Sequence, residues 1–308
     1  DVGEPRSAEQ TPSAVADTAV ADTVVTDALG RSVRFQHPVS RLVSLAPNLT
    51  EITFAAGGGR RLVAGTRSDD FPPPVDTLPK ISALPVDFEA IAAQRPGLVV
   101  ATDQVNAPRA ADTFDALDLP VYFFSFDQVR DVFDGIRQMG RLLGTASAAA
   151  DSAAALEASF DALRARTDDL GDGDRPRVLV LIGDETLYAF GGSSYVHTLV
   201  EAAGGRSITA DLEASAPTLS EEYVLEQRPD VIVGAWGADY DPDRLERLHP
   251  TWDVVPAVAS GRVYSLDPDL LLRPGPRLVD GAWAIARHLH PSRFAPSADP
   301  SPSPPLRP

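Results

Sequence analysis

The sequence predicts an α/β protein of two similar α/β lobes, bridged by a single long α-helix, with a ligand cleft between the lobes. Three observations lead to this fold class. Short β-branched runs alternate with amphipathic stretches, a pattern typical of βαβ units and a parallel sheet. The alternation is interrupted once, by an Ala-rich stretch over about residues 146–170. One phrase also occurs twice, as FEAIAAQRPGLVV from Phe88 and as EEYVLEQRPDVIV from Glu221.

The repeated phrase indicates that the two halves are related. Glu89 matches Glu222 and Pro96 matches Pro229, and each pair is separated by 133 positions without a gap. Because a proline disfavours the helical conformation in the residue before it, each phrase predicts a helix that ends before the proline and is followed by a strand. The same structural unit is therefore expected once in each lobe.

Residues 24–145 form the predicted N-terminal lobe. It begins with a hairpin around Leu29-Gly30. The expected strands that follow are RLVSLA, RLVAGT, GLVVAT and VYFF, and the expected helices are PNLTEITFAAG, DFEAIAAQR, APRAADTFDAL and VRDVFDGIRQMGRLLG. The bridging helix over 146–170 would contain about 24 residues and span roughly 36 Å.

Residues 171–291 form the predicted C-terminal lobe. Its expected strands are RVLVLI, DVIVGAW and RVYSLD, and its expected helices are SYVHTLVEAAGG, EEYVLEQR and RLVDGAWAIARHLH. Residues 1–23 are small, polar and Pro-containing, which predicts a disordered leader or tether. Residues 292–308 are rich in Pro and Ser, which predicts a disordered tail.

Composition and motifs restrict the function. Asp and Glu number 44 against 27 Lys and Arg, a net charge of −17, so a nucleic-acid partner is disfavoured. The chain has no cysteine, which excludes disulfides and thiolate metal sites. No GxSxG, GxxxxGK[ST], GxGxxG or HExxH pattern is present, and the five histidines are scattered. We therefore expect no catalytic residue, no metal ligand set and no enzyme.

Glu89 and Glu222 each fall in the first turn of a predicted helix. A first-turn carboxylate stabilises the free amides of a helix N-terminus, and this local role is one interpretation. The matched positions in two lobes support a second one, in which the pair docks one pseudo-symmetric basic partner.

Candidate ligand-binding residues lie in loops that follow predicted strands, where ligands of parallel α/β sheets bind. Asp269 accepts hydrogen bonds and Arg273 donates them, so together they could bind the amide groups of a polar ligand. In the alternative interpretation, the two residues form a local ion pair that stabilises the loop. In GTRSDDFPPPV, Ser68 and Asp69 belong to a second such loop. Tyr188 either stacks on a flat ligand or is a core aromatic.

Several phrases together resemble the periplasmic-binding family of ABC importers for vitamin B12, haem and iron siderophores. They are VTDALGRSVRF, RLVSLAPNLTEITFAAG, SDDFPPPV, the two QRP phrases and the loop ending in RPGPR, and they cover nearly all of 24–291. Within the family, the members that bind vitamin B12 are the most similar. The resemblance implies two α/β lobes, a rigid bridging helix and a shallow ligand cleft.

The resemblance also implies roles for individual residues. Glu89 and Glu222 fall on glutamates that dock onto permease arginines, and Asp269 and Arg273 on residues that approach the corrin side chains. Tyr188 falls on an aromatic cleft position. At three expected cleft positions this sequence differs from the family, because Ser68, Leu84 and Ala216 stand where the similar proteins have aromatic residues. Trp236 or Tyr240 would supply the missing aromatic rings.

We therefore expect a monomeric, periplasmic or otherwise extracytoplasmic solute-binding protein that carries a cobalamin-type corrinoid to an ABC permease. The corrinoid is the transported ligand and no cofactor is expected; a lipid tether before Asp1 is left open. Haem is one alternative ligand, and a ferric siderophore held by Arg67 and Arg273 is another. Two other classes are a nitrogenase-like two-lobed enzyme, which the missing cysteines disfavour, and an interaction module, which leaves the polar cleft without a role.

Overall fold

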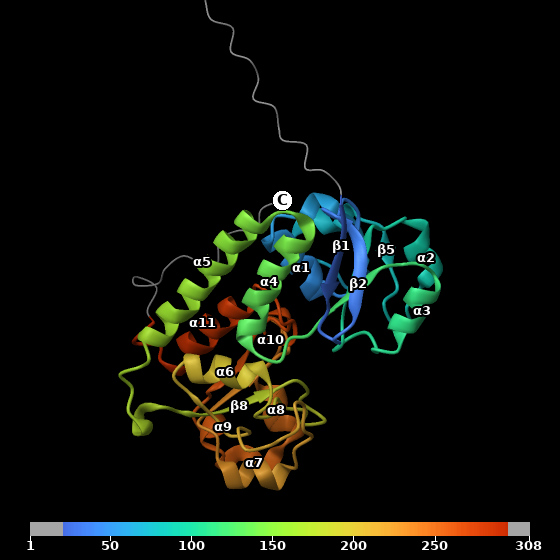
Figure 1. Ribbon diagram of the computed structural model, residues 1–308. Coiled ribbons are helices and arrows are strands. Elements are labelled where there is room, and N and C mark those ends of the chain that lie inside the picture. The colour runs from blue at the N-terminus through green and yellow to red at the C-terminus, as the bar shows by residue number, and fades with distance from the viewer. Residues whose placement is uncertain (1–20, 295–308) are drawn as a thin grey trace, which may run out of the picture.

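Figure 1 shows the computed structural model, which describes residues 21–294. The N-terminal lobe contains a five-stranded parallel sheet of order β5-β4-β3-β6-β7. Its strands are β3 (Leu42–Ser44), β4 (Leu62–Thr66), β5 (Lys80–Ile81), β6 (Leu98–Thr102) and β7 (Val121–Phe124). Its helices are α1 (Pro47–Ala55), α2 (Phe88–Ala93), α3 (Ala110–Ala116) and α4 (Val129–Leu143).

The C-terminal lobe contains a four-stranded parallel sheet of order β11-β10-β8-β9. Its strands are β8 (Arg177–Leu181), β9 (Arg206–Ser207), β10 (Val231–Gly234) and β11 (Val263–Ser265). Its helices are α6 (Tyr195–Ala202), α7 (Glu221–Gln227), α8 (Asp243–Leu248), α9 (Pro256–Ala259), α10 (Asp269–Leu272) and α11 (Leu278–Leu289). Short 3₁₀ turns lie at Gly59–Arg61, Pro73–Thr77, Asp172–Asp174 and Pro250–Val254.

The two lobes have the same topology, as the repeated phrase predicts. Taken in chain order, the strands β3, β4, β6 and β7 are arranged in space like β8, β9, β10 and β11, with the first strand between the second and the third. The repeated phrase also has the same backbone in both lobes. Arg95 and Arg228 stand before Pro96 and Pro229 and adopt left-handed conformations, with φ of 47° and 45°. In each lobe the chain therefore turns at the equivalent arginine before the following central strand, although α7 extends one equivalent residue further than α2.

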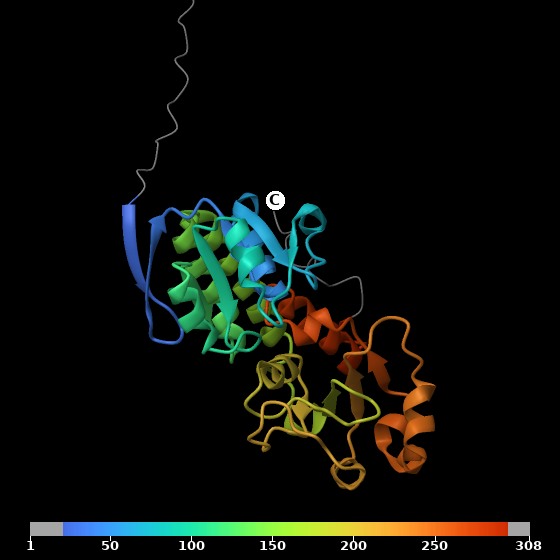
Figure 2. The ribbon, with the colours of Figure 1, turned by 90° about the vertical axis from the view of Figure 1, so that its right-hand side faces the viewer.

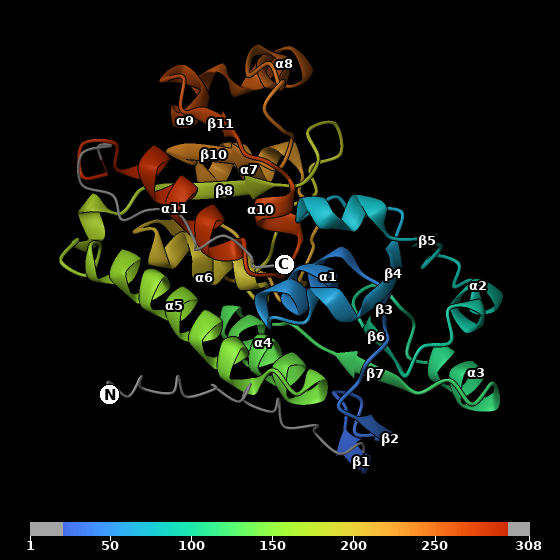
Figure 3. The ribbon, with the colours of Figure 1, turned by 90° about the horizontal axis from the view of Figure 1, so that it is seen from above.

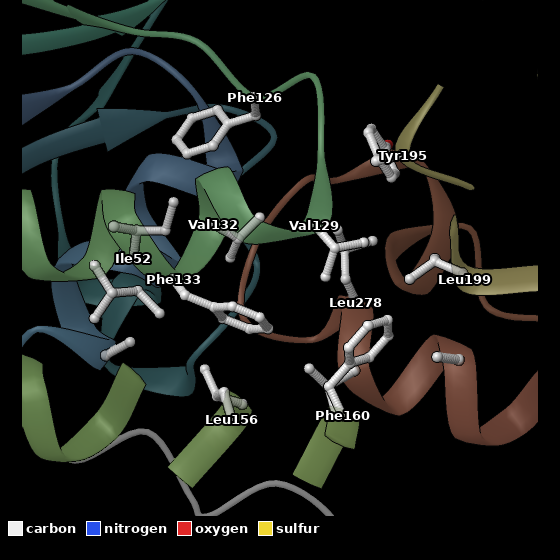
Figure 4. Close-up of a cluster of buried hydrophobic side chains, with 14 of the residues drawn as sticks. Ile52, Phe126, Val129, Val132, Phe133, Leu156, Phe160, Tyr195, Leu199 and Leu278 are labelled. Atoms are coloured by element: carbon white, nitrogen blue, oxygen red, sulfur yellow. The ribbon is translucent and has the colours of Figure 1, made fainter. Parts of the chain in front are cut away.

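The bridging helix is α5 (Ala146–Ala165), and Figures 2 and 3 show it and α11 beside the junction of the lobes. It packs on α4 of the first lobe and on α11 and α6 of the second. Its buried side chains Leu156, Phe160 and Leu163 belong to a hydrophobic cluster that extends into both lobes (Figure 4). The 20-residue helix spans about 30 Å, so one rigid element supports both lobes.

The structure corrects the predicted end of the bridging helix, residue 170. The helix ends at Ala165, and Arg166 is its C-cap. The buried hydroxyl of Thr167 donates to the carbonyl oxygen of Ala202 on α6, at 3.0 Å. The chain therefore turns here to place Thr167 against the second lobe, a contact that helical periodicity does not reveal.

The folded region also extends past both predicted boundaries. The predicted hairpin consists of β1 (Ala21–Thr26) and β2 (Ser32–His37), and Ala21 pairs with His37, so residues 21–23 belong to the fold. At the other end, Phe294 is buried and packs edge-to-face on Trp283, with ring centroids 5.8 Å apart. The remainder of the predicted leader (1–20) and of the predicted tail (295–308) lies outside the described residues.

Among the described residues, none of the helices combines the length and apolar character that a membrane crossing needs.

We predict that Leu156→Ala lowers the free energy of unfolding by about 2–5 kcal/mol, because it leaves a cavity between α5 and the lobes. Leu156 is 2% exposed, whereas Leu117 is 49% exposed. Leu117→Ala is the matched control and is expected to cost less than about 1 kcal/mol. Chemical denaturation measures both losses, and equal losses would contradict the supporting role of α5.

Candidate functional site

A cavity of about 300 Å³ lies between the lobes. The wall from the N-terminal lobe consists of residues at or after the carboxyl ends of β3 and β6. These strands are neighbours in the sheet, but the strand that follows β3 in the chain (β4) and the strand that follows β6 (β7) lie in opposite directions along it. Ligands of open α/β sheets bind at such switch points. The lining residues are Pro47, Asn48, Thr102, Gln104 and Val105 from the first lobe, and Phe190, Ser194, Tyr195, Ser215, Ala216, Leu272, Arg273 and Pro274 from the second.

Two of the polar lining groups, Asn48 and Tyr195, are held in place by neutral hydrogen bonds. The amide nitrogen of Asn48 donates across the lobes to the carbonyl oxygen of Pro274, at 3.2 Å. The hydroxyl of Tyr195 donates to the carbonyl oxygen of Leu271 at 2.8 Å, and burial raises the pKa of Tyr195. This tyrosine therefore presents its ring to the cavity while its oxygen remains protonated.

Arg273 connects the two lobes at the edge of this cavity. Its Nε lies 2.8 Å from Oδ1 of Asp269, so the local ion pair considered from the sequence is present. Its Nη1 lies 2.6 Å from Oδ1 of Asp70, and its Nη2 donates to the carbonyl oxygen of Ser68 at 3.1 Å. Arg273 thus makes the local pair and also reaches the other lobe.

A second, buried ion pair lies beside the first. Glu51 on α1 is 1% exposed, and its two carboxylate oxygens accept from Nη2 and Nε of Arg277 at 2.6 and 3.0 Å. Arg277 also contacts Asp269 at 3.1 Å, and its guanidinium lies 4.6 Å from the centre of the Phe71 ring. Burial raises the pKa of Glu51, and the hydrogen bond from Arg277 acts in the opposite direction. The pair fixes α1 of one lobe to the start of α11 in the other.

The two acidic residues of the SDDFPPP loop have different surroundings. Asp69 is 4% exposed, and its carboxylate accepts from the hydroxyls of Thr50 and Thr66 and from the backbone amide of Thr66. It therefore holds the loop from inside. Asp70 is exposed and faces Arg273, whose hydrogen bond lowers the pKa of Asp70.

The other predicted ligand-binding residues are distributed around the cavity. Ala216 and Arg273 line it, and Ser68 contributes its carbonyl oxygen to Arg273. Leu84 and Tyr188 are 69% and 47% exposed and are not lining residues of this cavity. Trp236 follows β10 and stacks on Tyr240 with centroids 4.2 Å apart.

Sequence reasoning missed several lining residues and the buried pair. Asn48, at the start of α1, comes four residues after β3, and Gln104 comes two residues after β6, so the strand-end rule applied to the second lobe also identifies them. Glu51 stands inside the apolar run of α1, where a charge needs a buried partner. No sequence signal indicates that this partner is Arg277, 226 positions away.

Glu89 and Glu222 occupy equivalent, exposed first-turn positions on α2 and α7. The N-caps of these helices are Asp87 and Ser220, whose side chains accept from the amides of Ala90 and Tyr223. Hydrogen bonds from its own backbone and from Ser220 lower the pKa of Glu222, so this carboxylate is ionised at neutral pH.

Residues 42–270 match the model of a protein family described as periplasmic binding protein. The chain belongs to this family. It is 26% identical to the vitamin B12-binding protein of Vibrio parahaemolyticus over 253 residues, which is 82% of this chain and 90% of that protein. The family consists of solute-binding proteins, which are non-enzymatic components of ABC importers.

Two solved structures have the same two-lobed fold of the helical-backbone class. The periplasmic vitamin B12-binding protein BtuF of Vibrio cholerae gives a TM-score of 0.71 at 25% identity, covering 82% of this chain and 97% of that chain. The periplasmic haem-binding protein RhuT of Roseiflexus gives a TM-score of 0.72 at 26% identity, covering 82% and 99%. The two are about equally similar to this chain, so similarity alone does not select the ligand.

We predict that Arg277→Gln lowers the free energy of unfolding at pH 7 by about 3–5 kcal/mol, because it removes the cation that is hydrogen-bonded to the buried Glu51 carboxylate and leaves Arg273, at 3.7 Å, as its remaining cation. The folded-state pKa of Glu51 is already above its ordinary value of 4.5, so its ionisation reduces stability as pH rises above that value. The loss is therefore expected to decrease as the pH falls toward 4.5.

Chemical denaturation at pH 7 and pH 5 measures this loss. Arg130→Gln is the control, because Arg130 forms an exposed pair with Asp134 and should cost less than about 1 kcal/mol. Adding Glu51→Gln to Arg277→Gln should restore part of the stability. A loss independent of pH and of Glu51 would contradict the assignment.

Proposed function

We propose that this protein captures a cobalamin-type corrinoid in the cleft between its lobes and delivers it to an ABC import permease outside the cytoplasmic membrane. The observation that carries the ligand assignment is the balance of donors and acceptors at Arg273, Arg277, Asp269, Asp70 and Glu51. Here two guanidinium groups meet three carboxylates, so the charge at this edge of the cavity is close to neutral.

A nearly neutral cluster suits a ligand with neutral amide groups at its edge. Amide nitrogens donate to carboxylates and amide oxygens accept from guanidinium groups, so Asp269 and Arg273 serve both halves of an amide. A corrinoid carries several such amides around an apolar macrocycle. It is larger than the 300 Å³ cavity, so its edge would enter while the ring lies on the exposed apolar side chains of Leu84, Tyr188 and Leu272.

Haem is the second candidate, and the similarity to RhuT favours it. Haem needs an axial ligand, but the cavity-lining Tyr195 uses its hydroxyl to bond Leu271. Tyr188, which is 47% exposed, is the tyrosine available for this role. A ferric siderophore is the third, with Arg67 and Arg273 as its basic contacts; Arg273 is already paired with two carboxylates.

Docking to the permease is assigned to Glu89 and Glu222. Both are exposed and occupy equivalent helix positions in two lobes of the same topology. The chain's net charge of −17 would assist approach to a basic partner. We propose that the protein acts as a monomer that presents one glutamate from each lobe.

Isothermal titration with cyanocobalamin tests the ligand assignment. We expect one-to-one binding that Arg273→Ala weakens about 10- to 100-fold, since a hydrogen bond to a charged group contributes about 1.5–3 kcal/mol. Arg109→Ala, an exposed arginine at the start of α3, is the control and should bind like the wild type. Binding of haemin or a ferric siderophore without binding of cyanocobalamin would replace the ligand and keep the family assignment.

Uptake in cells that carry the cognate permease tests the docking assignment. The double variant Glu89→Ala with Glu222→Ala should lower uptake at least tenfold while the Kd for the ligand stays within about twofold, because both side chains lie outside the cavity lining. The control removes two exposed carboxylates of α5, Asp151 and Asp161, and should transport normally. Undiminished uptake by the double glutamate variant would refute this docking surface.

A further inference from the structure

Asp70 is bound to the guanidinium group of Arg273, which is the group that the proposed ligand would contact. In the structure its two oxygens lie 2.6 and 3.3 Å from Nη1 and Nη2 of Arg273. This is the two-bond geometry that an arginine offers to any carboxylate, including one that belongs to a ligand. Asp70 comes from the first lobe and Arg273 from the second, so the protein itself supplies an anion across the cleft.

The Asp70–Arg273 pair differs from its buried neighbour in exposure. The side chains of Glu51 and Asp269 are 1% and 20% exposed, whereas that of Asp70 is 62% exposed. An ion pair with an exposed partner is screened by water and contributes less to stability than a buried one, and Glu51–Arg277 already joins the lobes. Holding the lobes together therefore does not explain why a carboxylate is placed at this position.

We propose that Asp70 is a specificity-determining residue that selects neutral ligand groups over anionic ones at Arg273. This inference rests on the proposed use of Arg273 in ligand binding and extends it to the ligand's charge. An amide oxygen accepts from Arg273 while Asp70 remains beside the guanidinium and accepts from the amide nitrogen. A ligand carboxylate meets Asp70 at contact distance, so it must either displace Asp70 or bear the repulsion of a like charge.

The neighbouring acidic groups support this direction of selection. Asp269 lies 2.8 Å from Nε of Arg273, and Glu51 lies 3.7 Å from Nη1, so displacing Asp70 still leaves two carboxylates beside the incoming anion. In contrast, Asp69, the preceding residue of the same type, faces inward to Thr50 and Thr66 and takes no part in this competition.

The test compares two nearly isosteric probes, cyanocobalamin and its monocarboxylates, in which one peripheral amide has become a carboxylate. We expect the wild type to bind at least one monocarboxylate tenfold or more weakly than cyanocobalamin. Asp70→Asn should reduce that preference at least fivefold. Asp76→Asn removes the same charge from an exposed position shortly after the loop and should preserve the preference. A preference that is equal in all three proteins overturns the proposal.

Failure of the proposed function gives a different pattern. If cyanocobalamin does not bind and haemin does, the corrinoid assignment fails, yet Asp70→Asn should still tighten haemin at least fivefold because haemin carries two carboxylates. Unchanged haemin affinity would overturn the role of Asp70 on its own.

A measurement without any ligand covers the case in which neither cyanocobalamin nor haemin binds. NMR titration of the Asp70 carboxyl should show a pKa below its ordinary value, because Arg273 donates to it, and Arg273→Gln should return that pKa toward the ordinary value. An Asp70 that titrates identically in both proteins is not held by Arg273, and the proposal is then overturned.

Discussion

Glu51 lies inside the junction between the lobes, where an ionised carboxylate is stable only beside a cation. Arg277 supplies that cation from the other lobe through two hydrogen bonds. The Glu51–Arg277 ion pair therefore fixes how α1 faces the start of α11. The cavity depends on this alignment, because its two walls contain Asn48, three residues before Glu51, and Arg273, four residues before Arg277. The bridging helix supports the same junction from outside through Leu156 and Phe160.

The common topology of the lobes places equivalent elements on both of them. In each lobe the loops after the carboxyl ends of the strands supply the cavity lining, while α2 and α7 each present a first-turn glutamate. In the proposed docking, one duplicated unit supplies both surfaces that a pseudo-symmetric partner would contact. The identity of the backbone at Arg95 and Arg228 shows that the duplication extends to local conformation.

The charged cluster has a buried part and a more exposed part, and the selective role that we propose belongs to the second. Its buried part, Glu51 with Arg277, joins the lobes, and its exposed part, Asp70 with Arg273, faces the cavity edge. Because the exposed pair is near neutral, the site offers hydrogen bonds without a strong preference for anions.

The sequence by itself determined most of the elements, their order and the positions of Glu89 and Glu222. It did not predict the short elements β5, β9, α8, α9 and α10. The features that it did determine depend on periodicity, on Pro96 and Pro229, and on the N-caps Asp87 and Ser220, all of which act within a few residues. It also identified Arg273, because strand-end loops gather at one edge of a parallel sheet, and the family resemblance identified Ala216.

Only the tertiary structure decided which charges meet. Arg273 and Asp70 are 203 positions apart, and Glu51 and Arg277 are 226 apart, so no local pattern encodes their pairing. The sequence could not distinguish Asp69 from Asp70 either, because the two residues are adjacent and chemically identical. Packing of the loop against Thr50 and Thr66 turned one carboxylate inward and left the other facing the cleft. The end of α5 was decided in the same way, by the contact of Thr167 with α6.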